Sequence, residues 1–202
     1  NPQKLGFQLQ RQAVTAAVMH EKFGTPILPL SEDQVATMGE LLESQTAEQR
    51  AQYLNGLSSN ITDTDQYIAV LSQIRPNSPA TAQAGAFMQA QIIDDDSATP
   101  GYKIAATLLR GEEIVNPPKQ KDGSRPKSNY SFPDDIDKTF IENTGGLFSG
   151  NVTQQFEALD SVKAYYAALS SDVGDYSDKL DNGRLQKAID DVVGKVSDPN
   201  GN

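Results

Sequence analysis

Residues 30–74 decide the fold, and they read LSEDQVATMGELLESQTAEQRAQYLNGLSSNITDTDQYIAVLSQI. Three helix starts follow one another within this stretch. Ser31 and Thr46 are each followed three residues later by a glutamine, which is the pattern of a capping box. Thr62 offers a third start, with Asp65 at the reciprocal position. The stretch therefore predicts three short helices arranged head to tail.

Apolar residues after each start recur every three or four positions, as on one face of a helix, and not in the alternation of a strand. They are Val35, Met38, Leu41 and Leu42, then Ala51, Leu54 and Leu57, then Tyr67, Ile68 and Leu71. The same spacing predicts further helices over residues 4–23, 79–93, 100–110, 134–143 and 152–169, and from Asn182 onward. We therefore expect an all-α fold, an irregular bundle of about eight or nine short helices with one long Pro/Lys-rich loop.

The pattern also assigns helix ends and inward faces. Thr99 is expected to cap a helix whose first residue is Pro100, and Gly111 is expected to end it. Gly145 is the expected end of the helix at 134–143. The residues expected to face inward are Tyr102, Ala105, Ala106 and Leu109, then Ile136, Phe140 and Ile141, then Val152, Phe156, Leu159, Val162, Tyr166 and Leu169.

Residues 116–133, NPPKQKDGSRPKSNYSFP, contain prolines and charges without apolar periodicity. We expect an exposed, mobile connection between an N-terminal helical unit, 1–115, and a C-terminal unit, 134–202, packed together as one domain. The connection holds the basic residues Lys119, Lys121, Arg125 and Lys127. They are interpreted as part of a solvated linker, with electrostatic contact to nucleic acid or an acidic partner as the alternative.

Charge and composition limit the possible functions. The chain has 202 residues, a formal net charge of −10 and no cysteine. Net negative charge disfavours binding to nucleic acid. The lack of cysteine excludes disulfides and cysteine-based sites from this sequence. No apolar run approaches the ~18 residues of a membrane span. Because the chain begins without methionine and ends in SDPNGN, we expect it to be a fragment of a larger protein.

Acidic clusters and the single histidine give no metal site. Asp94, Asp95 and Asp96 are adjacent, without the alternate spacing of an EF-hand calcium loop, and are interpreted as a solvated turn. Acids at three-residue intervals are expected to lie in a loop and to serve solubility; they are Asp172, Asp175, Asp178 and Asp181. His20 has no second imidazole nearby in the sequence and is interpreted as structural or solvated.

One pair of residues has a catalytic counterpart. Glu43-Ser44 resembles the Glu-Ser pair of lytic transglycosylases, in which the glutamic acid protonates the glycosidic oxygen. However, Glu43 lies in LLESQTAEQR, a polar helix end, whereas a general acid needs an apolar cleft that raises its pKa. We assign no catalytic, cofactor-binding or metal-binding residue in this sequence.

A broader resemblance rests on four segments. They are FQLQRQAV at 7–14, FGTPILPLSEDQV at 23–35, ATLLRGEEIV at 106–115 and SVKAYYAALSSDVGDYSDKLDNGRLQKAIDDVVGKV at 161–196. Together they resemble the large helix-rich virion proteins of tailed bacteriophages and prophages, some of which carry a lytic transglycosylase domain elsewhere in the chain.

The resemblance implies a non-catalytic structural or assembly segment of a virion protein. Such a protein is made in the bacterial cytoplasm, assembled into the particle and in some cases delivered to the host envelope. Its implied partners are other virion proteins or further copies of itself, with no small-molecule cofactor. Two alternatives stay open: a lytic transglycosylase acting on peptidoglycan with Glu43 as general acid, and a helical protein-protein binding module.

Overall fold

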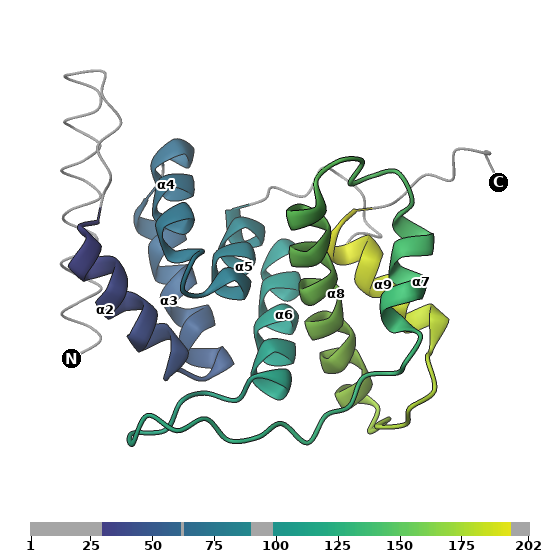
Figure 1. The fold of residues 1–202 in the computed structure, drawn as a ribbon. Helices are drawn as coiled ribbons and strands as arrows, with labels where there is room; N and C mark the ends of the chain where they lie inside the picture. Colours follow the sequence, from purple (N-terminus) through teal and green to yellow (C-terminus); the bar gives the residue numbers. More distant parts are fainter. Residues whose placement is uncertain (1–29, 62, 90–98, 195–202) are drawn as a thin grey trace.

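The computed structural model describes residues 30–61, 63–89 and 99–194, and in these ranges the chain forms eight α-helices and no strand (Figure 1). The prediction of an all-α fold with about eight or nine helices is thus confirmed. The helices are α2 Glu32–Glu43, α3 Ala47–Asn60, α4 Thr64–Ile74, α5 Pro79–Gln89, α6 Gly101–Val115, α7 Ile136–Thr144, α8 Val152–Asp172 and α9 Asn182–Val192. The helix expected at 4–23, with His20, and the acids Asp94, Asp95 and Asp96 lie outside the described residues.

Two of the three predicted caps are confirmed. Ser31 and Thr46 both form complete capping boxes at the starts of α2 and α3. The start of α4 is capped by Asp63, whose carboxylate accepts the backbone N–H of Gln66 at 2.9 Å. Aspartate and threonine both suit this position, so the spacing alone misplaced the start by one residue. Thr62 itself lies outside the described residues.

Helix α6 is the centre of the described fold. It packs against α8 more extensively than any other pair of helices does, and next most extensively against α5 (Figure 1). The side chains that it buries are Ile104, Ala105, Leu108 and Leu109. Because α5 precedes the loop at 116–133 and α8 follows it, α6 joins the two sequence segments into one packed structure.

Four expectations for α6 are wrong. The helix begins at Gly101 with Pro100 as its N-cap and no side-chain cap, so Thr99 does not start it. Tyr102 is 59% exposed and Ala106 is exposed too, because α6 is covered on the sides that face α5 and α8 and these two positions lie on neither. Gly111 does not end the helix, which continues to Val115.

Gly111 serves packing instead. A Cβ atom at this position would lie 1.7 Å from the backbone oxygen of Ala164 in α8. Only a residue without a side chain lets the two helix backbones approach this closely. The α6–α8 contact therefore requires glycine at this position. Packing against α8 offsets the lower helix stability that glycine brings compared with alanine.

Helices α7 and α8 each bury part of the face that the sequence predicts. In α7, Ile136 and Phe140 are buried but Ile141 is 50% exposed, because this short helix makes only slight contacts, with α8 and α9. Gly145, with φ at +38°, ends α7 as expected. In α8, Tyr166 is buried, whereas Phe156 is 62% exposed, as is Val152 nearer the helix start.

The loop at 116–133 has no helix, as predicted, but it is attached to the bundle. The backbone N–H of Lys119 donates to the carbonyl oxygen of Glu43 at 2.9 Å, and the Ser128 hydroxyl donates to the carbonyl of Ile114 at 2.7 Å. Residues 120–127 are exposed. The mobility expected of this loop stays a prediction. Among the described helices, none is long and apolar enough to cross a membrane.

Candidate functional site

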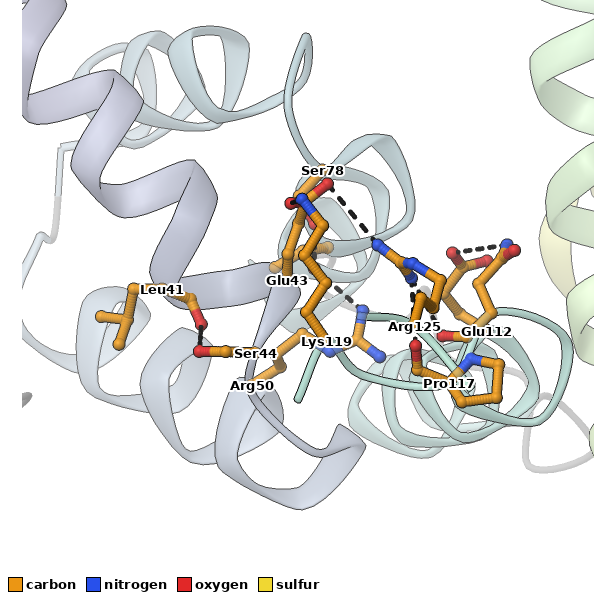
Figure 2. Close-up of polar contacts among 11 residues, drawn as sticks. Leu41, Glu43, Ser44, Arg50, Ser78, Glu112, Pro117, Lys119 and Arg125 are labelled. Atoms are coloured by element: carbon orange, nitrogen blue, oxygen red, sulfur yellow. Dashed lines mark hydrogen bonds and ion pairs between the residues drawn. The ribbon is translucent and has the colours of Figure 1, made fainter. Parts of the chain in front are cut away.

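Glu43 is held by the Pro/Lys-rich loop. Lys119 forms an ion pair with one carboxylate oxygen, and Arg125 Nη2 lies 3.6 Å from the other (Figure 2). The side chain of Glu43 is about one-third exposed. Both oxygens are thus engaged by cations of the same chain, and this contact joins the loop to the C-terminal end of α2. The position of Glu43 fits an anchor for the loop.

The basic residues of the loop divide into two groups. Lys119 and Arg125 turn toward the bundle; Arg125 Nη1 also donates to the carbonyl oxygen of Pro117 at 3.2 Å. Lys121 and Lys127 are exposed to solvent. The interpretation as a solvated linker is therefore corrected for Lys119 and Arg125, because both pair with Glu43, although the Arg125 side chain stays 36% exposed.

Asp175, Asp178 and Asp181 lie in the loop after α8, as predicted, but Asp172 is the last residue of α8 itself. Three of the four aspartates form ion pairs. Asp172 pairs with Arg110 at 2.6 Å, and Asp175 and Asp181 pair with Arg184 at 2.6 and 3.0 Å. The hydrogen bond from Arg184, with further ones from Ser177, lowers the pKa of Asp175 to about 2. Asp175 and Asp181 fix the α8–α9 connection and Asp172 joins α8 to α6, so a role in solubility alone is corrected. Within the described residues, no group of acids and histidines is arranged to hold a metal ion.

A cleft of about 600 Å³ opens between α4, α5, α6 and α8. Its volume falls in the range of ordinary ligand sites, about 300–1,000 Å³. The apolar side chains that line it are Ile68, Leu71, Ala82, Ala86, Val115, Phe132, Ala158 and Ala164. Its polar lining includes Arg75, Gln83, Glu112, Glu157, Asp160 and Lys163. No sequence motif indicated this cleft.

The cleft follows from small residues on α5. Their sequence pattern predicts close approach of a neighbouring helix, and α5 does pack closely on α6. On the side that faces α8, however, Ala82 and Ala86 are too short to fill the space, and an open cleft results. A run of alanines in the sequence is compatible with both outcomes, so the cleft could not be located before the positions of α6 and α8 were known.

Two carboxylates in the cleft have no ion-pair partner among the described residues. Arg75 pairs with Glu157 across the cleft, and Lys163 pairs with Asp137 at 2.8 Å. Glu112 and Asp160 form no such pair. Burial raises the pKa of Glu112, an effect that Asp160 reinforces and a hydrogen bond from Asn116 opposes. Partial burial also raises the pKa of Asp160.

Replacing Glu112 by glutamine is expected to raise the melting temperature at pH 7. A carboxyl whose pKa is raised by folding binds protons more tightly in the folded state, so the stability of the native chain falls as pH rises above 4.5, the ordinary value. Glutamine keeps the oxygen that accepts from Asn116, and it removes the free-energy cost of burying a charged carboxylate. Thermal melts from pH 3.5 to 8 should coincide at the acid end and separate as pH rises. Equal pH profiles would show that Glu112 is not desolvated.

A second, smaller pocket of about 180 Å³ adjoins the cleft. Glu112, Asn116, Pro79 and Ala80 line both. The pocket also contains Arg50, which is only 6% exposed although the sequence AEQRAQYL places it at an ordinary polar helix position. Burial lowers the pKa of Arg50, while Glu112 and Glu113 act in the opposite direction.

Comparison of the chain with protein families, with curated proteins and with solved structures finds no match.

Proposed function

We propose that this chain is a non-catalytic structural and assembly segment of a phage or prophage virion-associated protein, and that it binds a partner protein in the large cleft. The resemblance of the four sequence segments supports the virion context. The cleft is the main structural support for the proposal, because it offers a site in which a partner protein can bind.

Two of the helices that line the cleft form its opposite walls. One is the alanine-rich helix α5, and the other is the N-terminal half of α8. Ile68 of α4, at 52% exposure, lines the cleft, and Phe156, at 62%, precedes the cleft residue Glu157. Large exposed apolar side chains beside a groove are typical of a protein-protein contact.

The charges in the cleft indicate the chemistry of the partner. Glu112 and Asp160 form no direct ion pair with a described residue in the cleft, and the whole chain carries a net charge of −10. Two copies of such a chain repel each other. The occupant that fits is therefore a segment of another protein that combines apolar residues with lysine or arginine.

The proposal is tested by reversing the charge of Asp160 in a bacterial strain that produces the virus particles containing this protein. Asp160 is exposed, so Asp160→Lys should keep the fold and reduce incorporation of the protein into purified particles about tenfold or more. Glu40→Lys on α2 is the matched control, since it makes the same charge change at an exposed helical position outside the cleft. Incorporation is measured by quantitative mass spectrometry, and folding by circular dichroism. Equal incorporation of both variants and the native protein would refute binding in the cleft.

A further inference from the structure

The smaller pocket lies where four parts of the chain meet. It is bordered by the α2–α3 junction, the N-terminus of α5, the C-terminal end of α6 and the Pro/Lys-rich loop (Figure 2). The side chains that carry its chemistry are Gln45, Arg50, Asn77, Glu112, Asn116 and Arg125, with Glu43 at its edge. The proposed function assigns no role to this pocket or to the side chains that line it.

Arg50 is a buried cation without an adequate partner in this structure. Its guanidinium forms no ion pair with a described residue. Its hydrogen bonds are long, 3.5 Å to the Thr81 hydroxyl and 3.4 Å to the carbonyl oxygen of Leu109, and Nε has no partner. Arginine is rarely buried unless it is paired. Glu112 and Glu113 act on this cation, but neither is in direct contact with it, so the guanidinium can still bind an anion.

A second cation and a helix end strengthen this reading. Arg125 lines the same pocket, and its repulsion adds to the effect of burial in lowering the pKa of Arg50. Ser78, Pro79 and Ala80 bring the N-terminus of the 11-residue helix α5 to the pocket wall. Helix N-termini favour anions. Three sources of positive potential therefore meet in one small volume.

The pocket also contains hydrogen-bond acceptors. Gln45 Oε1 is buried and has no partner, and the carboxylates of Glu43 and Glu112 border the same space. A fully deprotonated anion such as sulfate would face these oxygens without a hydrogen to donate. A protonated oxyanion can accept from Arg50 and Arg125 and donate to Gln45 at once.

Size narrows the choice further. The volume of about 180 Å³ lies below the range of about 300–1,000 Å³ typical of drug-sized ligands. It exceeds the space of one water, about 30 Å³ in the liquid. We propose that this pocket binds a phosphate group. Arg50 and Arg125 donate to the phosphate oxygens, and the phosphate hydroxyl donates to Gln45 Oε1.

The group could be free phosphate or a phosphate monoester, and titration calorimetry in a phosphate-free buffer distinguishes them. Inorganic phosphate, glycerol phosphate and sulfate are titrated in turn into the native chain. We expect phosphate to bind and sulfate to bind at least about tenfold more weakly, because sulfate cannot donate to Gln45. Binding of glycerol phosphate as well as inorganic phosphate would identify a monoester as an acceptable source, and its exclusion would identify the free ion.

Matched variants locate the site. Arg125→Gln, at a partly exposed position, is expected to weaken phosphate binding about tenfold, and Arg50→Met to abolish it. Arg110→Gln is the control, since Arg110 is an exposed arginine paired with Asp172 outside the pocket. Circular dichroism confirms folding. Gln45→Met should reduce the preference for phosphate over sulfate, a change that loss of structure would not produce.

Each other result counts against the proposal. If the folded native chain binds none of the three ions, the pocket holds water only and the proposal is wrong. Equal affinity for sulfate refutes the role of Gln45 and the protonated form of the ligand. An Arg110→Gln variant that loses as much affinity as Arg125→Gln would show general electrostatic attraction. Because Asp160 lies outside this pocket, failure here leaves the cleft proposal to its own experiment.

Discussion

Gly111→Ala is expected to lower the free energy of unfolding by about 3 kcal/mol. The added Cβ would lie 1.7 Å from the carbonyl oxygen of Ala164 and 2.4 Å from its carbon. These are backbone atoms of α8, so no side-chain rotation can relieve the overlap, and α6 must separate from its main partner. The effect is opposite in sign to the usual gain when glycine within a helix is replaced by alanine.

Gly56→Ala in α3 is the matched control. Nothing lies within 4 Å of the position of its Cβ, so the same substitution is expected to stabilise the chain by about 0.5–1 kcal/mol. Urea denaturation followed by circular dichroism measures both values. If the two substitutions change stability in the same direction, the backbones of α6 and α8 do not approach each other closely at Gly111.

Tyr166→Asp is expected to unfold the chain, whereas Phe156→Asp on the same helix is not. Tyr166 is 1% exposed, and its hydroxyl accepts the backbone N–H of Asp181 at 3.0 Å. The substitution leaves a cavity and buries a charge, at a cost of about 5 kcal/mol or more. Native domains are stable by about 5–15 kcal/mol, so this cost removes between a third and all of the stability and unfolds a chain at the lower end of the range.

Phe156 is 62% exposed, and its replacement should change stability by no more than about 0.5 kcal/mol. According to the proposed function, it should still reduce incorporation into particles, since Phe156 is a large exposed apolar side chain on the helix that forms one wall of the cleft. Thermal melts and particle composition are measured for both variants. Unfolding by Phe156→Asp would place this residue in the core, and normal incorporation would place the partner surface elsewhere.

Local features were predictable from the sequence, and features that depend on distant neighbours were not. The caps of α2 and α3 were found because Ser31 and Thr46 act on residues only three positions away. The role of Gly111 was missed because its reason lies in Ala164 of another helix. A glycine that ends a helix and one that permits a helix contact look alike in a single sequence.

The candidate sites show the same limit. Arg50 stands among glutamines and alanines, and nothing in that pattern indicates burial. Its pocket exists because residues near positions 45, 78, 112 and 125 converge in space. The cleft likewise needs α4, α5, α6 and α8 in place at once. Apolar spacing predicts that helices form, but the spaces between them depend on which faces meet.

The central position of α6 has a consequence for binding kinetics. Both walls of the cleft, α5 and α8, rest on this one helix, and Gly111 brings its backbone into direct contact with that of α8. The distance between the walls is therefore set before any partner arrives, and the site is preorganised. Under the proposed function, a partner segment docks without first opening the bundle, so little ordering cost opposes its association. The free and bound forms of this chain should then differ mainly in side-chain rotamers along the cleft.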